Sequence, residues 1–222
     1  MRASASSVSV VDVYQRKDVF YTRAKAAGYR SRAAFKLQQL AQRGRLLRRG
    51  DRVVELGAWP GGWLQVVAAD VGPKGRVVGV DLQPIDALPE SNVITVVGDI
   101  RDSHTQERVM RVCGRKADVL LSDLAPKLSG VRARDAAQAQ ALADCVLQWV
   151  ERGLKPGGKL VVKLFMGNDL PQYLARLRTL FRDVHLTRPE ATRRGSTEVY
   201  VVASDFRGSP AGASDASHGT TL

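Results

Sequence analysis

The length, composition and charge of this chain exclude several classes of protein. Its 222 residues, 44% of them hydrophobic, are enough for one substantial core, and no apolar stretch approaches the roughly 18 residues of a membrane span. The two cysteines, Cys113 and Cys145, are far apart and lack metal-ligand spacing, which argues against a disulfide framework or a metal site and fits a reduced cytoplasmic compartment. We therefore expect a soluble cytoplasmic protein with one catalytic-size domain and no membrane attachment.

The positive charge is concentrated near the N-terminus. The chain has 34 Lys and Arg against 22 Asp and Glu, a net charge of +12. Residues 1–50 hold 12 basic and two acidic residues, so the rest of the chain contributes only +2. A basic segment joined to a nearly neutral domain is typical of proteins that bind polyanions. The alternative is a solvated helix face, although acidic partners at helical spacing are almost absent here.

The first regular elements are expected between Asp18 and Leu47, where the pattern is helical with a break at Gly28-Tyr29. Ser31 is the expected N-cap of the second helix. Apolar residues of this helix can face a core while basic residues remain available to a ligand: Arg30, Arg32 and Lys36. On periodicity alone, Lys36 is one more surface lysine.

From residue 51 to about 204, strand and helix patterns alternate. Strands are expected at 52–56, 76–82, 92–97, 118–121, 159–165, 184–186 and 198–203, and helices at 62–71, 104–113, 134–152 and 169–181. This alternation predicts an α/β fold with a mostly parallel seven-stranded sheet and helices on both faces. Ligands of such sheets bind at the carboxyl ends of the strands.

The turn after the first strand is rich in glycine and reads Gly57-Ala-Trp-Pro-Gly-Gly62. It lacks both the Gly-Lys-Ser/Thr of a phosphate-binding loop and the Gly-x-Gly-x-x-Gly spacing of a dinucleotide site. An adenosyl group without phosphates is the better candidate. The alternative is that these glycines only make a tight corner between strand and helix.

Acidic residues close three of the following strands. Asp81 stands some twenty residues after the turn, where an acidic side chain commonly accepts hydrogen bonds from a ribose. Asp99 is placed to bind the amino group of an adenine, and Asp123 ends the next strand. Each alone is more simply a helix N-cap or a turn residue. Three in succession at one sheet edge favour a ligand site.

Two further charged residues belong to apolar strands. Lys163 interrupts Leu160-Val-Val-Lys-Leu-Phe165, and a buried lysine with a lowered pKa is a candidate base. The alternative is an edge strand whose lysine reaches solvent. Glu198 opens the last strand, where it could be only a solvated strand end.

In combination these segments resemble the FtsJ-type ribose 2′-O-methyltransferases, most closely the RlmE group, over residues 14 to 204. The resemblance rests on six motifs: Tyr29-Arg-Ser-Arg-Ala-Ala-Phe-Lys-Leu37, Leu56-Gly-Ala-Trp-Pro-Gly-Gly-Trp63, Gly98-Asp-Ile-Arg-Asp102, Ser122-Asp-Leu-Ala-Pro126 with Ser129-Gly130, Val161-Val-Lys-Leu-Phe165 and Ser196-Thr-Glu-Val-Tyr200. It implies a Rossmann-like fold, S-adenosyl-L-methionine as cofactor, and 2′-O-methylation of a uridine in the A-loop of 23S rRNA in the large (50S) ribosomal subunit.

The resemblance also assigns roles to residues. It implies a catalytic set of Lys36, Asp123, Lys163 and Glu198, and cofactor contacts by Glu55, Gly57, Gly61, Trp63, Asp81, Asp99 and Asp123. RNA contacts are expected from Arg30, Arg32 and Lys36. Glu55 stands where the family usually has Asp and keeps the charge, whereas Trp59 replaces a small residue and its role stays open.

The chemical role of Lys163 is open at this point, because a neutral amine would accept the 2′-OH proton and a charged one would stabilise the developing alkoxide. Two alternatives to the favoured function also remain: a methyltransferase of the same fold acting on tRNA or an mRNA cap, and a non-catalytic ribosome-assembly factor. Retention of all four catalytic positions argues against the latter. We expect a monomer with a flexible N-terminus (1–13), a basic RNA-binding extension (14–50), a methyltransferase domain (51–205) and a disordered tail (206–222).

Overall fold

The computed structural model describes residues 19–126, 129–167, 169–193 and 195–208, so the predictions for 1–18 and 209–222 lie outside the described residues. A helix over residues 19–26 precedes α2. The elements that follow are α2 (Ala33–Gly44), β1 (Arg52–Leu56), α3 (Gly62–Val71), β2 (Arg76–Asp81), β3 (Val93–Val97), α4 (Ser103–Cys113), β4 (Ala117–Ser122), α5 (Arg132–Gly153), β5 (Leu154–Phe165), α6 (Leu170–Leu180), β6 (Phe181–Thr187) and β7 (Glu198–Phe206).

The strands form one seven-stranded sheet in the order β3-β2-β1-β4-β5-β7-β6. Its strands run parallel except β7, which is antiparallel to β5 and β6. The predicted α/β class with a mostly parallel sheet is therefore confirmed. Strand order reverses between β1 and β4, which places the ligand crevice of such a fold at the carboxyl ends of these two strands.

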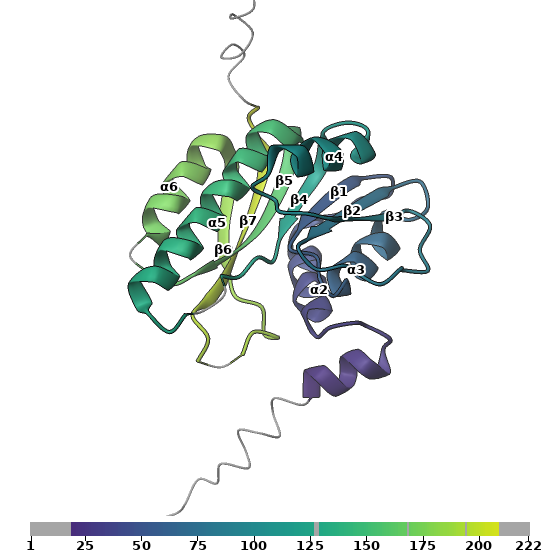
Figure 1. Cartoon of the computed structure of the whole chain (residues 1–222), viewed down its shortest axis with the longest axis horizontal. Coiled ribbons are helices and arrows are strands. Elements are labelled where there is room, and N and C mark those ends of the chain that lie inside the picture. The colour runs from purple at the N-terminus through teal and green to yellow at the C-terminus, as the bar shows by residue number, and fades with distance from the viewer. Residues whose placement is uncertain (1–18, 127–128, 168, 194, 209–222) are drawn as a thin grey trace, which may run out of the picture.

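Alternating side chains of the strands build two cores, one on each face of the sheet. Val53, Val119 and Leu121 pack with residues of α2 and α3. On the other face, Val54 and Leu120 pack with residues of α4, α5 and α6, the helices that cover that side of the sheet (Figure 1). Successive side chains of a strand point to opposite faces of the sheet, and most side chains of the central strands are apolar, so both faces are buried.

The carboxyl ends of the parallel strands lie at the lower end of the molecule in Figure 1, together with the loop between β6 and β7 and the helix over 19–26. The chain leaves β7 at the opposite end. Residues far apart in the sequence therefore meet at one edge of the sheet. None of the helices within the described ranges is long and apolar enough to cross a membrane.

Several element bounds differ from the expected ones; β6, for example, begins at Phe181, where the preceding helix was expected to continue. The N-cap of α2 is Arg32 and not Ser31, because the chain is already helical at Arg32 and the Ser31 hydroxyl packs against Gly62 instead of capping the helix. β5 begins at Leu154, five residues earlier than expected, and includes the Pro156-Gly157-Gly158 segment that reads as a turn in the sequence. β7 continues to Phe206, whose ring packs against Phe181 with centroids 5.3 Å apart.

Candidate active site

The four residues of the expected catalytic set come together at the carboxyl ends of β4 and β5. Lys36 of α2 forms an ion pair with Glu198, the first residue of β7. Lys163 of β5 donates to the Asp123 main-chain carbonyl at 2.6 Å, and its Nζ lies 3.1 Å from Asp123 Oδ1. Lys163 lies between β4 and β7 in the sheet and its side chain is only 8% exposed, which removes the alternative of an edge-strand lysine.

Tyr200 joins these two ion pairs, a role that the sequence interpretation missed. Its hydroxyl accepts a hydrogen bond from Lys36 Nζ at 3.3 Å and donates one to Asp123 Oδ1 at 2.8 Å. The side chain is fully buried, and burial together with the charges of Asp123 and Glu198 raises its pKa. The phenol therefore stays protonated and fixes the geometry between the two lysines. A signal was present, since Tyr200 follows Glu198 by two residues and so shares its face of the strand.

The charge state of Glu198 is set by competing effects. Burial alone would raise its pKa, but the hydrogen bond from Lys36 and the charges of Lys36 and Lys163 lower it below the usual range. Glu198 is therefore an anion at neutral pH. The site holds two lysines and two carboxylates in two ion pairs, Lys36 with Glu198 and Lys163 with Asp123.

The glycine-rich turn lies between β1 and α3, at the point where strand order reverses. Gly57 has φ of 79°, and a Cβ there would come within 2.7 Å of Leu124 Cδ2 and 3.4 Å of Leu124 Cα, so the turn lies close to the segment after β4. Gly61, with φ of 104°, is the N-cap of α3. Both positions therefore need glycine for steric reasons, whatever binds beside them.

Asp81 and Asp99, two of the carboxylates expected to bind the cofactor, are both paired with groups of the protein itself. Asp81 accepts from the main-chain N–H groups of Trp59 and Gln83, both at 2.9 Å, and so ties the turn to the end of β2. Asp99 forms an ion pair with Arg101 at 2.6 Å. That guanidinium lowers the pKa of Asp99.

The tryptophans of the turn differ in burial. Trp63 is buried, donates from Nε1 to the Ala33 carbonyl at 2.7 Å, and packs near Tyr200 with ring centroids 6.0 Å apart. Its indole therefore joins the turn to α2 and packs against Tyr200, which bridges the two ion pairs. Trp59 is 51% exposed, so its ring points outward from the turn, and nothing in the structure assigns it a contact role.

Glu55 is buried at the end of β1 and its Oε2 has no hydrogen-bond partner. Burial raises its pKa well above the usual value, and the negative charges of Asp123 and Asp81 raise it further. Three carboxyl groups thus meet at the switch point of the sheet. Such a site fits a cationic ligand, and the sulfonium and ammonium groups of S-adenosyl-L-methionine supply this charge.

Glu55→Gln is expected to stabilise the free protein at neutral pH. The pKa of Glu55 is higher in the folded than in the unfolded state, so its ionisation cost is absent below the unfolded pKa and grows as pH rises toward the folded pKa. Each pKa unit of difference corresponds to about 1.4 kcal/mol. In urea denaturation, the free energy of unfolding of Glu55→Gln should exceed that of wild type at pH 8, and the difference should shrink toward pH 4. A gain independent of pH would contradict this assignment.

Two arginines before α2 have different surroundings. The Arg30 guanidinium donates to three main-chain carbonyls, at Pro60 (3.3 Å), Asp86 (2.6 Å) and Ala87 (2.7 Å), and so links the start of this segment to the cofactor turn and to the loop after β2. Burial and the charge of Arg193 lower the pKa of Arg32, while Glu198 acts in the opposite direction. Arg32 is half-buried and interacts electrostatically with Arg193 and Glu198.

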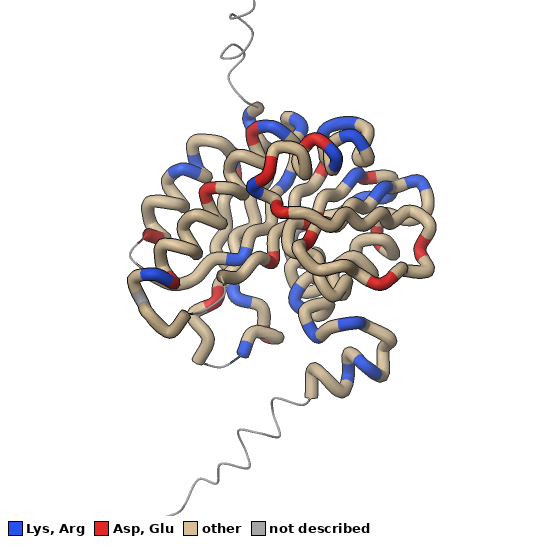
Figure 2. The backbone as a smooth tube through the Cα atoms, in the orientation of Figure 1, with Lys and Arg blue, Asp and Glu red and all other residues tan. Residues whose placement is uncertain are grey.

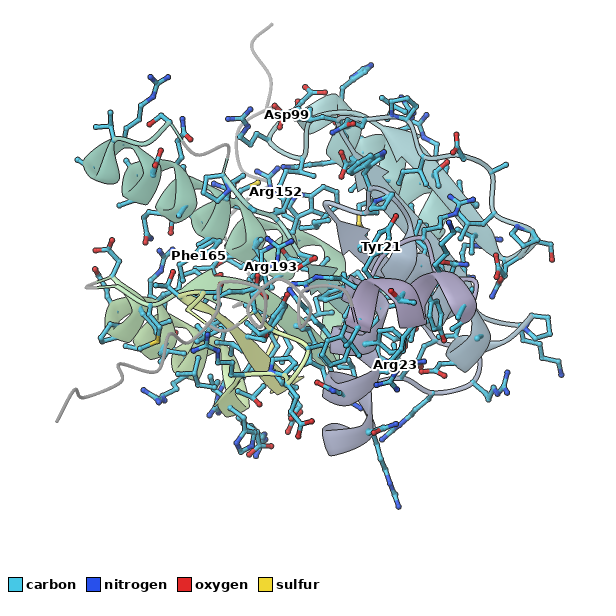
Figure 3. All side chains as sticks on the ribbon, turned by 90° about the horizontal axis from the view of Figure 1, so that it is seen from below. Tyr21, Arg23, Asp99, Arg152, Phe165 and Arg193 are labelled. Atoms are coloured by element: carbon cyan, nitrogen blue, oxygen red, sulfur yellow. The ribbon has the colours of Figure 1, made fainter. Side chains whose placement is uncertain are left out.

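Further basic residues surround this edge of the sheet. Figure 2 shows Lys and Arg on the helix over 19–26, on the segment before α2 and on the loop between β6 and β7. Figure 3 looks onto the edge and labels Tyr21 and Arg23 in the helix, Arg193 in the loop and Phe165 at the end of β5. Of the residues expected to face RNA, Arg32 is half-buried near this basic edge, whereas Lys36 is buried and paired with Glu198.

Comparison with known proteins gives a consistent result. The FtsJ-like methyltransferase family model matches residues 29–206. The chain is 44% identical over 200 residues to the ribosomal RNA large subunit methyltransferase E of Halorubrum lacusprofundi, which covers 90% of this chain and 74% of that protein. It is 41% identical to the protein of the same name from Methanobrevibacter smithii, over 87% of this chain and 92% of that one.

Solved structures agree at the level of the fold. A Plasmodium falciparum protein assigned as a ribosomal RNA methyltransferase superposes with a TM-score of 0.71 at 26% identity, over 82% of this chain and all of that one. Fibrillarin of Aeropyrum pernix, with natively bound S-adenosyl-L-methionine, has a TM-score of 0.53 at 17% identity, over 71% of this chain and 68% of that one. The second likeness shows the Rossmann-like methyltransferase fold alone.

These findings settle the class of the protein and its cofactor. A family match that spans both the glycine-rich turn and the expected catalytic set, with relatives above 40% identity, makes the chain an enzyme that uses S-adenosyl-L-methionine. The acidic switch point suits that cofactor. The chain belongs to the FtsJ-like methyltransferase family.

Proposed function

We propose that this enzyme methylates the 2′-hydroxyl of a uridine in the A-loop of 23S rRNA, in the large (50S) ribosomal subunit. The observation that carries the proposal is the joined set Lys36, Glu198, Tyr200, Asp123 and Lys163 beside the cofactor turn. Several relatives above 40% identity bear the name ribosomal RNA large subunit methyltransferase E, which supports rRNA as the substrate class. The 50S subunit as partner, a monomeric state and a cytoplasmic location are predictions that accompany this proposal.

The catalytic residues act on the acceptor hydroxyl. S-adenosyl-L-methionine supplies an electrophilic methyl group, so oxygen, methyl carbon and sulfur must be aligned. Lys163 donates to the carbonyl and is paired with the carboxylate of Asp123, which orients its Nζ toward the end of β4. A neutral Nζ takes the 2′-OH proton, whereas a charged one donates to the oxygen as negative charge develops and the proton passes to solvent.

The basic rim supports binding of the RNA backbone. Contacts between Arg or Lys and phosphates position nucleic acid without reading its sequence, and they weaken as salt rises. Arg32 brings this rim to the catalytic set, since it is half-buried and interacts electrostatically with Glu198, the partner of Lys36. RNA is preferred over DNA because only a ribose carries the 2′-OH.

Arg30→Ala and Arg32→Ala are expected to have different effects, although both remove one arginine from the same segment. Arg30→Ala removes the hydrogen bonds that link the cofactor turn at Pro60 to the loop after β2. It should lower the affinity for S-adenosyl-L-methionine about tenfold, the effect of roughly one lost hydrogen bond to a charged group. Arg32→Ala should leave that affinity unchanged. It should lower RNA affinity and reduce the salt slope by about one.

Calorimetry with the cofactor alone and salt-dependent RNA binding measure the two effects separately. If Arg30→Ala lowers only RNA affinity and reduces the salt slope, Arg30 contacts phosphate and the positioning role is wrong. Arg30→Lys should recover part of the cofactor affinity, because a lysine reaches one carbonyl where arginine reaches three.

The substrate proposal is tested by exchange of RNA. The enzyme is incubated with labelled S-adenosyl-L-methionine and either large subunits from methylation-deficient cells, tRNA or capped mRNA. Label in the rRNA of large subunits alone is expected. Preferential labelling of tRNA or of the mRNA cap would mean that this RNA, and not rRNA, is the substrate. No labelling of any RNA would favour a non-catalytic assembly factor.

A further inference from the structure

A second concentration of positive charge lies at the amino ends of the parallel strands, at the end of the molecule opposite the catalytic set. Residues 72–76, 45–52, 111–118 and 154–159 lead into β2, β1, β4 and β5, which are neighbours in the sheet. These four segments, the amino edge, hold eleven Lys and Arg against Asp51 and Asp118, a net charge of +9. Figure 2 shows Lys and Arg at this upper end of the molecule.

The opposite edge of the same four strands carries no such excess. The segments that close or follow these strands, residues 81–86, 57–61, 123–126 and 166–167, hold three acidic residues and no Lys or Arg. The positive rim around the catalytic set therefore comes from other parts of the chain. Strands of five or six residues are about 17–20 Å long, so roughly this distance separates the two edges. The amino edge is thus a surface distinct from the rim.

Part of the charge of the amino edge has a structural role. Arg49 and Arg76 donate to main-chain carbonyls in the last turns of α3 and α4, where cations offset the helix dipole. The side chains of Arg48, Lys74 and Lys116 are exposed and take no part in these contacts. These three charges are therefore available to a partner.

The crowding of basic groups has an electrostatic cost. Burial and the charge of Arg48 lower the pKa of Lys159, and Arg115 and Lys155 share one carboxylate, that of Asp118. Like charges at this density repel one another, and a polyanion that binds among them relieves the repulsion. The amino edge therefore suits a negatively charged partner.

The amino edge lacks the apolar groups that other classes of partner use. Within the described ranges, the exposed large hydrophobic side chains lie elsewhere, among them Trp59 after β1 and Met166 after β5. Protein interfaces are built around aromatic and aliphatic anchors, and membrane-surface helices insert an apolar face. A surface of arginine, lysine and glycine instead suits phosphate groups, which need charge and hydrogen-bond donors.

We propose that the amino edge binds the phosphate backbone of a second RNA segment, remote from the target nucleotide. The proposal rests on the proposed function and adds a surface that the rim and the catalytic set do not include. A single RNA stem docked at the rim meets one end of the protein, whereas the folded rRNA of the large subunit carries further helices that can reach the other end. Contact at both ends favours the large subunit over an isolated RNA fragment, because the two surfaces act as a linked pair.

The test removes the three exposed charges whose side chains hold no helix end. The triple variant Arg48→Ala, Lys74→Ala and Lys116→Ala is compared with wild type for binding to large subunits from methylation-deficient cells and to a short RNA hairpin that carries the target segment. Binding of the variant to large subunits should be weaker by about tenfold or more, and its salt slope should fall by about two to three. Binding to the hairpin, which meets only the rim, should be unchanged.

A charge-preserving triple variant is the matched control. Arg48→Lys, Lys74→Arg and Lys116→Arg keep every charge, so this variant should bind both RNAs nearly as wild type does. Unchanged binding of the alanine variant to large subunits, or an equal loss with the hairpin, would overturn the proposal.

Two further outcomes separate this proposal from other readings. If the alanine variant loses binding to vesicles of anionic lipid while its binding to large subunits stays intact, the amino edge is a membrane surface and the proposal is wrong. If wild type binds large subunits but methylates no RNA, the proposed function fails, and the binding comparison still decides for or against the amino edge.

Discussion

Lys163→Ala is expected to slow methyl transfer by about 10²–10⁴-fold, the usual contribution of a positioned proton-transfer group. The amine is held by two acceptors on Asp123, and its removal leaves no other group of β5 at this position. Affinity for S-adenosyl-L-methionine should change less than the rate. Lys163 contacts one expected cofactor residue, Asp123, and the others lie on β1, the turn after it, α3, β2 and the segment after β3. Single-turnover kinetics with saturating cofactor and RNA measures the step directly.

Lys159→Ala is the matched control for this prediction. Lys159 belongs to the same strand, four residues earlier, and its Nζ donates to main-chain carbonyls after α2, away from the catalytic set. Its loss should affect stability without a comparable loss of the methyl-transfer rate. A Lys163→Ala enzyme within threefold of wild type would remove Lys163 from the reacting centre.

A pH-rate profile separates the two chemical roles of Lys163. A neutral base gives a rate that rises with pH and reaches a plateau above the pKa of the amine, whereas a charged stabiliser gives a rate that falls as the amine loses its proton. Absence of any inflection attributable to Lys163 would exclude the base. The profile must be taken on the single-turnover step, so that product release does not hide the chemistry.

Lys36→Ala is expected to destabilise the protein by about 3–5 kcal/mol, because it leaves Glu198 charged, largely buried and without its main partner. The two side chains are only 9% and 15% exposed. Urea denaturation at pH 7 measures the change. Lys25→Ala, at an exposed lysine of the helix over 19–26, removes the same charge and should have little effect.

The effect of Lys36→Ala should also depend on pH. The pKa of Glu198 is lower in the folded than in the unfolded state, so its contribution to stability is present above the unfolded pKa and is lost as pH falls through the folded pKa. The difference between wild type and Lys36→Ala should therefore shrink below about pH 4. In the double variant with Glu198→Ala, the loss should be smaller than the sum of the single losses. If the two losses of unfolding free energy add, the interaction between Lys36 and Glu198 does not contribute to stability.

The sequence predicted the positions of most strands and helices well, because apolar patterns and glycine-rich turns are local features of the sequence. β1 and α3 have the expected bounds, and the end of every strand that was expected to bear a functional residue lies at one edge. β5 was placed five residues short because Pro156 and two glycines are typical of turns. Leu154 pairs with Ala117 of β4, and the regular ladder resumes at Lys159 after a shift of register, so the Pro-Gly-Gly segment is an irregularity within the strand. Pairing between strands is not visible in a local pattern.

The site was less accessible to sequence than the fold. Lys36 read as a surface lysine by periodicity, and it is buried only because Glu198 and Tyr200, more than 160 residues away, complete its pocket. Arg30 read as available to RNA, whereas its guanidinium is engaged by carbonyls of the cofactor turn and the loop after β2. Main-chain carbonyls carry no sequence signal, so such contacts could be found only in three dimensions.

The most direct measurement is nucleoside analysis of rRNA after incubation of the enzyme, large subunits from methylation-deficient cells and methyl-labelled S-adenosyl-L-methionine. Complete digestion followed by chromatography identifies which atom of which nucleoside carries the label. The joined catalytic set around Lys163 predicts labelled 2′-O-methyluridine from wild type and a strongly reduced amount from Lys163→Ala. Label on a base, or equal 2′-O-methyluridine from both enzymes, would contradict ribose methylation by this set of residues.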